Sequence, residues 1–252
     1  MSCRRFENTN ILVTGAASGI GQASAIRFAQ EGGNVACLDL NEEGAKKTAE
    51  MCAKLGVKAL AYKVDVTNQA EVKATVDKAV EDLGGIKVLA HIAGALKTYH
   101  THLMTPEEWH RIIDINLHGT FYVNHAALPH LLKNRFSSIV NMASTAAIGS
   151  HPWMSAYAAA KGGVVSFTRA LYIEYVKQGL RANSVVGGGI ATGLHAEFKV
   201  PEGGDAKLLQ GAMPFVKFVG PEHAASVIAF LASDDARYVN GTEVRADGGA
   251  LS

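Results

Sequence analysis

At 252 residues and 48% hydrophobic composition, the chain is long enough to bury one sizeable core, and we expect a single domain spanning 1–252. Its 24 Lys and Arg residues nearly balance its 23 Asp and Glu residues, giving a formal net charge of +1, which argues against nucleic acid or anionic membranes as partners. Three cysteines without metal-type spacing, and an N-terminus "MSCRRFENTN" lacking the apolar stretch of a signal peptide, predict a cytoplasmic protein.

Short apolar runs rich in β-branched residues alternate with longer helical patterns along the whole chain. Several of these runs are almost continuously apolar, as expected of parallel strands covered on both faces. The alternation predicts βαβ units, and therefore an α/β fold with a doubly wound parallel sheet of about seven strands and helices on both faces. The expected strands are 10–16, 34–40, 58–66, 87–94, 138–144, 181–186 and 242–248.

Two helix starts carry clear capping signals. Asn68 precedes apolar residues that recur at helical spacing from Val72 to Leu83, and is predicted to cap that helix. "TPEEW" offers Thr105 as N-cap and Pro106 as the first helical residue, followed by two carboxylates in the first turn. One later stretch, 187–214, is long, glycine-rich and weakly periodic. We expect it to be a lid over the substrate.

The segment "ILVTGAASGIG" leads from the first strand into the first helix through Gly15, Gly19 and Gly21. Such a turn lets backbone amides and the helix dipole approach a pyrophosphate, where a side chain would collide. Asp39, at the end of the second strand, is placed to accept hydrogen bonds from an adenosine ribose and to repel a 2′-phosphate, which favours NAD over NADP. The plainer alternatives are a turn that merely needs glycines and an aspartate that caps its own turn.

Tyr157 and Lys161 lie four residues apart in "YAAAK", on one face of a predicted alanine-rich helix. Taken alone, such a pair is most often an ordinary surface contact. Ser144, however, closes the fifth predicted strand, and Asn116 lies in a helical region after the fourth. In open α/β sheets, ligands bind outside the carboxyl ends of the strands, which is where Ser144 is expected to emerge.

These four residues, with "TGAASGIG", "DVT" (65–67), "YAAAK" and "VRADGG" (244–249), resemble the short-chain dehydrogenase/reductase family over residues 10–250. The resemblance implies a Rossmann-type fold and a catalytic set of Asn116, Ser144, Tyr157 and Lys161. Tyr157 is then the general acid/base and Ser144 steadies the substrate oxygen. Lys161 is expected to hold the nicotinamide ribose, and Asn116 a water that relays protons to the lysine. Each also has a structural interpretation: Ser144 as a strand-end cap, Asn116 as a helix-bend residue.

The resemblance also implies a wider set of contacts. The cofactor-binding residues expected from it are Gly15, Ser18, Gly19, Ile20, Gly21, Asp39, Asp65, Val66, Ala93, Gly94, Tyr157, Lys161, Ile190 and Thr192. The expected substrate pocket includes Ala146, His151, Met154 and Leu194. The ten histidines lack carboxylate or cysteine partners at ligand spacing, so we expect no metal.

The electrostatic interaction expected between Lys161 and Tyr157 is large enough for a phenol to transfer protons near neutral pH. Lowering a tyrosine pKa from ~10 by about three units requires about 4 kcal/mol. A unit charge at ~4 Å, with an effective dielectric of about 20, supplies roughly that amount. We therefore expect Lys161 to make Tyr157 acidic enough for proton transfer, with help from the positive nicotinamide of NAD⁺.

Two departures from the family pattern stand out. The usual Asn-Asn-Ala-Gly after the fourth strand is His91-Ile92-Ala93-Gly94, and we expect His91 to make a structural hydrogen bond. The usual Pro-Gly after the sixth strand is Gly187-Gly188, and losing proline frees the backbone. We therefore predict a mobile lid base, with fast amide hydrogen exchange over 187–200 in the cofactor-free protein. Strong protection there would contradict this.

The predicted pocket borders are mainly apolar and hold no arginine cluster, which favours a secondary alcohol or ketone on a hydrophobic body. The first alternative is a 3-oxoacyl-thioester (acyl-carrier-protein) reductase. A second, of another class, is a non-catalytic NAD-binding regulatory or scaffold protein. By resemblance we also expect a homo-oligomer, a tetramer rather than a dimer, formed through the helices around 117–134 and 157–178.

Overall fold

The computed structural model describes residues 4–193 and 198–251, and the predicted sheet is its centre. In the described part of the chain, seven parallel strands lie in the order β3-β2-β1-β4-β5-β6-β7. This confirms the doubly wound α/β fold. The strands are β1 Asn10–Thr14, β2 Asn34–Asp39, β3 Ala59–Lys63, β4 Val88–His91, β5 Ser138–Ser144, β6 Arg181–Gly187 and β7 Glu243–Ala246.

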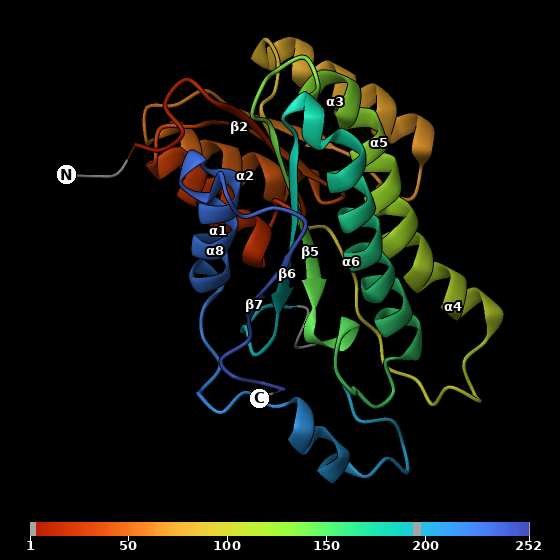
Figure 1. The fold of residues 1–252 in the computed structure, drawn as a ribbon. Coiled ribbons are helices and arrows are strands. Elements are labelled where there is room, and N and C mark those ends of the chain that lie inside the picture. The colour runs from red at the N-terminus through yellow and green to blue at the C-terminus, as the bar shows by residue number, and fades with distance from the viewer. Residues whose placement is uncertain (1–3, 194–197, 252) are drawn as a thin grey trace.

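Helices cover both faces of the sheet (Figure 1). One layer comprises α1 Gly19–Gln30, α2 Glu42–Ala53 and α8 Pro221–Ala232. The other comprises α3 Gln69–Leu83, α5 Gly119–Leu131 and α6 Ser155–Tyr175. The helix α4, Pro106–Ile113, leads through a π-helical turn, η1 Asp114–His118, into α5. Short 3₁₀ turns are η2 Thr145–Ala147, η3 Val176–Gln178, η4 Ala206–Ala212 and η5 Asp234–Ala236.

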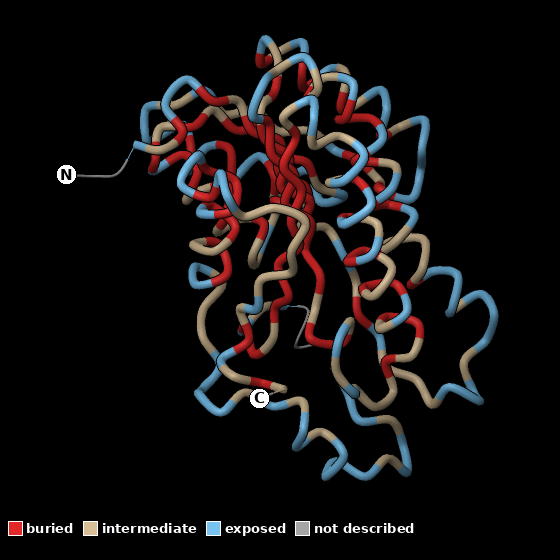
Figure 2. The backbone as a smooth tube through the Cα atoms, viewed as in Figure 1, coloured by how far each residue is buried: buried red, intermediate tan, exposed pale blue. Residues whose placement is uncertain are grey.

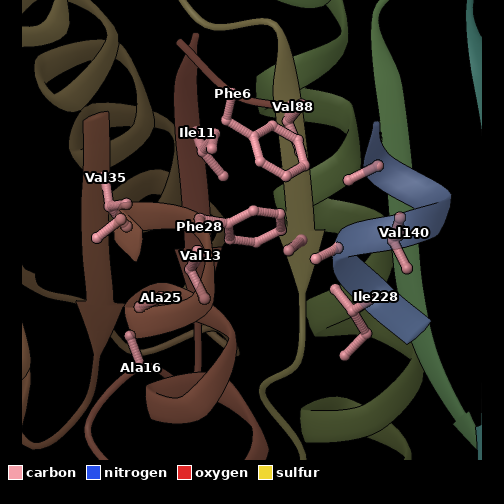
Figure 3. Close-up of a cluster of buried hydrophobic side chains, with 14 of the residues drawn as sticks. Phe6, Ile11, Val13, Ala16, Ala25, Phe28, Val35, Val88, Val140 and Ile228 are labelled. Carbon is pink, nitrogen blue, oxygen red and sulfur yellow. The ribbon is translucent and has the colours of Figure 1, made fainter. Parts of the chain in front are cut away.

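The core lies between the sheet and each helical layer, because the strands are buried on both faces (Figure 2). On the α1–α8 side, the rings of Phe6 and Phe28 meet edge to face at 4.9 Å between centroids, beside Ile228 (Figure 3). On the other side, valines and leucines of α3 and α5 pack against β1, β4 and β5.

The predicted helix starts are confirmed. The Asn68 side chain accepts a hydrogen bond from the amide of Glu71 at the start of α3. Thr105 and Glu108 form a reciprocal capping box at α4, with Pro106 in the first turn. No helix in residues 4–193 or 198–251 is long and apolar enough to cross a membrane.

Several strands end earlier than predicted. The chain leaves β1 after Thr14 because Gly15 adopts φ +68°. Expected strand 87–94 ends at His91, since the amides of Ile92 and Ala93 donate to the Thr14 side chain instead of a neighbouring strand. The strand expected over 58–66 ends at Lys63, and the one expected over 242–248 ends at Ala246.

Candidate active site

A glycine turn at the carboxyl end of β1 forms one wall of the site. A Cβ on Gly21 would lie 2.0 Å from the carbonyl oxygen of Gly15, and one on Gly15 would lie 2.8 Å from the amide of Ala93. Ser18, the N-cap of α1, makes no side-chain capping bond, and the first turn carries no acidic residue. The turn therefore leaves helix amides and positive dipole facing outward, as binding of a pyrophosphate requires.

Asp39 lies at the end of β2, beside this turn. One carboxylate oxygen accepts from the amide of Ala17 at 2.9 Å and the other from the amide of Asn41 at 2.8 Å. Asp39 therefore caps its own turn, which is one of the two alternatives given in the sequence analysis. Each oxygen retains a lone pair for a ribose hydroxyl. The β2–β3 register also places the exposed Lys63 opposite Asp39, a neighbouring cation that the sequence pattern did not reveal.

A cavity of about 630 Å³ joins the glycine turn to the end of β5. It is lined by Asp39 and the three turn glycines at one end and by Ser144, Tyr157 and Lys161 farther along. Beyond these polar groups its walls are mostly apolar, formed by Leu96, Met154, Phe198, Leu209, Met213 and Phe218. A volume of this size is typical of small-molecule and cofactor pockets.

Ser144 and Tyr157 meet in this cavity. Ser144 ends β5, and its hydroxyl accepts from the amide of Ala146, so that it also caps the turn η2. Tyr157 projects from the first turns of α6, with its ring against Leu96 and Met154. Burial raises the pKa of Tyr157 to about 12, and a hydrogen bond with Ser144 acts in the opposite direction. The pair presents two hydroxyls to one point in the cavity.

Lys161 lies one turn farther along α6 and is 3% exposed. Its Nζ is 5.7 Å from the centroid of the Tyr157 ring and donates to the carbonyl of Met142 at 2.9 Å. Burial lowers the pKa of Lys161 to about 8. Burial sets the direction of the Tyr157 pKa shift here, and the acidification expected from Lys161 together with the positive nicotinamide stays a prediction.

Asn116 lies within the π-helical turn η1 and is fully buried. Its amide group donates to the carbonyls of Ala95 and Ile112, and its Oδ1 accepts from the amide of Ala95. The side chain therefore braces the segment after β4. A Cβ on Gly94 would lie 2.8 Å from the Asn116 Oδ1 and 3.2 Å from the Lys161 Nζ, which explains why this segment needs a glycine.

His91 makes the structural hydrogen bond that we expected. Its Nδ1 lies 2.8 Å from the Thr14 Oγ1, across the β1–β4 pair. The ring is 1% exposed, and burial together with the charge of Lys161 lowers its pKa to about 3. His91 is thus a neutral imidazole that ties two central strands together.

Not all the predicted residues line the cavity. The Asp65 carboxylate accepts from the amide and hydroxyl of Thr67, Val66 packs against Gly119, and neither residue borders the cavity. Ala146 is buried in the apolar cluster behind Met154. The remaining predicted residues that line it are Ser18, Ile20, Ala93, Gly94, His151, Ile190 and Thr192. Leu194 lies outside the described residues.

His151 sits at the cavity wall. Its Nδ1 lies 3.3 Å from the carbonyl of Gly149, which can only accept, so in the neutral ring Nε2 accepts from the Thr145 hydroxyl at 3.0 Å. Burial lowers the His151 pKa. Among the residues that the structure describes, no group of three histidine, cysteine or acidic side chains is placed to hold a metal ion.

The predicted lid contributes more of the cavity than the sequence indicated. Leu209, Ala212, Met213 and Pro214 line it from the segment around η4, which lies beyond the carboxyl ends of β5 and β6 (Figure 1). Phe218 follows just outside the predicted range. Leu209, Ala212 and Met213 have helical spacing, but the run is too short for periodicity to give a clear signal.

The glycines at the lid base lie close to neighbouring side chains. A Cβ on Gly187 would lie 2.4 Å from the Met142 side chain, and one on Gly188 would lie 2.7 Å from the Thr145 methyl. The amide of Gly188 donates to the carbonyl of Ala246. The exchange behaviour of this segment stays a prediction, but its glycines have a steric reason to be there.

Comparisons with known proteins agree with this geometry. Residues 15–250 match the family model described as "Enoyl-(Acyl carrier protein) reductase". The chain is 38% identical over 249 residues to a cyclohexanol dehydrogenase of Acinetobacter sp. (strain SE19), covering 98% of this chain and 97% of that protein. It is 37% identical over 247 residues to a 3-oxoacyl-[acyl-carrier-protein] reductase of Thermotoga maritima, covering 98% and 99%.

Solved structures give the same result. A carveol dehydrogenase from Mycobacterium avium, in complex with NAD, superposes with a TM-score of 0.88 at 28% identity, covering 98% of this chain and 99% of that one. The likeness extends over the whole sheet and both helical layers, so the glycine turn and the Ser144–Tyr157 end belong to a fold that holds a nicotinamide cofactor in that relative.

Proposed function

The chain belongs to the short-chain dehydrogenase/reductase family, whose members are oxidoreductases of CH–OH groups that use a nicotinamide cofactor. We propose that this protein interconverts a secondary alcohol and a ketone on a hydrophobic substrate with NAD. The observation that carries this proposal is the meeting of Ser144 and Tyr157 in a cavity whose far walls are apolar. A hydroxyl-bearing apolar molecule fits such a cavity better than a charged one.

The residues present fit the cofactor. The open amides of the glycine turn and α1 would hold its pyrophosphate, Asp39 its adenosine ribose, and Lys161 its nicotinamide ribose. When bound, the nicotinamide supplies the hydride chemistry that no side chain can perform. Its positive charge in the oxidised form is also the additional charge that the Tyr157 phenol needs.

The side chains would divide the remaining work. During oxidation, Tyr157 takes the proton of the substrate hydroxyl through its phenolic oxygen, and during reduction it returns a proton there. Ser144 donates a hydrogen bond to the same substrate oxygen and stabilises its developing charge. Lys161 supplies positive charge beneath the tyrosine ring, and Asn116 keeps the segment after β4 in place.

The substrate class can be tested with a panel of alcohols and NAD⁺: cyclohexanol, an aliphatic secondary alcohol, a hydroxysteroid and a 3-hydroxyacyl thioester. We expect the highest kcat/KM with a cyclic or other compact apolar alcohol, in keeping with the named activity of the Acinetobacter relative. A marked preference for the thioester would favour the 3-oxoacyl reductase, the activity named for the Thermotoga relative. Tight NADH binding without turnover of any compound would favour a binding protein.

Cofactor choice depends on Asp39. A carboxylate ~5 Å from a 2′-phosphate is repelled by several kcal/mol at an effective dielectric of about 20. We expect Asp39→Ala to lower the preference for NAD⁺ over NADP⁺ by about 100-fold, because the repulsion is lost while Lys63 remains nearby. The ratio of kcat/KM for the two cofactors measures this. Lys63→Ala is the matched control, and should leave the preference for NAD⁺ in place. An unchanged ratio in Asp39→Ala would contradict the assignment.

We also propose that the protein is a homo-oligomer, a tetramer in preference to a dimer. Phe121 on α5 and Ile173 on α6 are exposed, at 43% and 67%, on the two helices expected to form the interface. Light scattering of the purified protein gives the oligomeric state directly.

A further inference from the structure

His91 leaves one polar atom without a partner in the interior. Its Nε2 is fully buried and makes no hydrogen bond to the protein. A buried donor left unpaired costs about 1–3 kcal/mol, so such atoms are rare. The family pattern has an asparagine at this position, and an asparagine side chain is too short to reach where Nε2 lies.

The protonation of the ring follows from Thr14. The Thr14 Oγ1 accepts from the amides of Ile92 and Ala93, at 3.1 and 3.3 Å, which uses both of its lone pairs. Its own hydrogen therefore goes to the His91 Nδ1 at 2.8 Å. A neutral imidazole that accepts at Nδ1 carries its hydrogen at Nε2. The unpaired atom is thus a donor, held in one direction by the Thr14 bond.

The Lys161 ammonium lies near the segment after β4 and bonds to β5. His91 is the register partner of Asn141 in the β4–β5 pair, and the Lys161 Nζ donates to the carbonyl of the next residue, Met142. The Nζ also lies near Gly94, three residues beyond His91. The charge of Lys161 is one of the two causes of the lowered His91 pKa. The ammonium has three hydrogens, and Met142 accepts one of them.

Lys161 is the charged group that acts on His91 among the described residues. Nearby polar side chains on η1, α5 and β5 include the amides of Asn116, Asn124 and Asn141, and α6 adds Thr168 and Tyr157. Asn124, Asn141 and Thr168 bond to one another. The Nε2–H and the ammonium are both buried donors, so neither can satisfy the other. One acceptor lying between them would satisfy both.

We propose that His91 and Lys161 together hold one buried water molecule, whose oxygen accepts from the His91 Nε2 and from the Lys161 Nζ. Such a site satisfies the unpaired donor and gives the water the polar partners that internal waters need. His91 is then a positioning residue: by fixing this acceptor, it helps Lys161 to stay charged and in place near Tyr157. Only this role for Lys161 rests on the proposed function, because the water site exists without turnover.

Two substitutions separate this role from the bond to Thr14. His91→Asn keeps an acceptor for Thr14, in the position of Nδ1, but has no group where Nε2 lies. His91→Gln extends an amide to the position of Nε2. A crystal structure of the wild-type protein should show a water within hydrogen-bond distance of both the Nε2 and the Nζ, and His91→Asn should lose that water or displace it. An Nε2 with no water beside it, or one bonded directly to a protein group, would overturn the proposal.

The second readout is the Lys161 pKa, measured by NMR with lysine labelled at Cε and assigned with Lys161→Met. Removing an acceptor from an ammonium destabilises its charged form, so we expect the Lys161 pKa to fall by about one unit in His91→Asn. It should return in His91→Gln. A purely structural histidine would change the melting temperature but not this pKa. An unchanged or raised Lys161 pKa in His91→Asn would overturn the proposal, whatever the protein's substrate.

Discussion

Tyr157→Phe is expected to lower kcat for alcohol oxidation by about 1,000-fold, within the range for removal of a general acid/base. The phenylalanine keeps the ring, which packs against Leu96 and Met154, and removes only the hydroxyl. NADH affinity and melting temperature should therefore change little. Steady-state kinetics, fluorescence titration with NADH and thermal denaturation measure these three quantities.

The matched control for this change is Tyr238→Phe. It makes the same chemical change at a fully exposed side chain and should leave all three quantities unchanged. Wild-type turnover in Tyr157→Phe would remove Tyr157 from the chemistry. Loss of NADH binding in that variant would mean instead that the hydroxyl is needed to assemble the cofactor site.

Lys161→Met is expected to lower kcat by at least 100-fold, because it removes the positive charge beneath the tyrosine while keeping a side chain of similar length. It should also raise KM for NAD⁺, since Lys161 is expected to hold the nicotinamide ribose. Lys177→Met, at an exposed position on η3, is the control. Retention of both kcat and KM in Lys161→Met would contradict the role given to this lysine.

Lys161→Met is also expected to change how the stability of the folded protein depends on pH. The folded-state pKa of Lys161 is about 8, below its ordinary value of 10.5. Below pH 8 the lysine is protonated in both states, and the cost of burying its charge is fully present. Between pH 8 and 10 the folded protein releases this proton while the unfolded chain keeps it, so this residue's contribution to stability rises with pH, by about 2–3 kcal/mol. Urea unfolding should show that rise in the wild-type protein and a flatter profile in Lys161→Met. Parallel profiles would contradict it.

Local signals in the sequence predicted most of the fold. The caps at Asn68 and Thr105 and the turn at Gly15 involve neighbours within a few residues, so they are readable without a structure. The end of β4 is different. It depends on Thr14, which lies 77 residues from His91 in the sequence and whose hydroxyl takes the place of a strand partner. No local pattern contains that information.

The motifs predicted which residues form the site, but the pKa of Tyr157 depends on its burial in the folded chain. Ser144, Tyr157, Lys161 and the glycine turn line one cavity, as the resemblance implied. The acidity of Tyr157 was not predictable, because the sign of its pKa shift depends on how much water the folded chain removes from the phenol. The apolar walls from Phe198 and Phe218 were missed for a related reason: they come from irregular segments that face the cavity only in the folded protein.

The central claim is that this chain moves a hydride between a hydrophobic secondary alcohol and NAD, and an isotope label tests it most directly. Cyclohexanol and the other panel alcohols, deuterated at the carbinol carbon, would be incubated with NAD⁺ and the protein, and the reduced cofactor examined by mass spectrometry. We predict deuterium in the NADH formed from at least one apolar alcohol, and none with Tyr157→Phe over the same time. NADH binding without label transfer from any of these alcohols would contradict the claim.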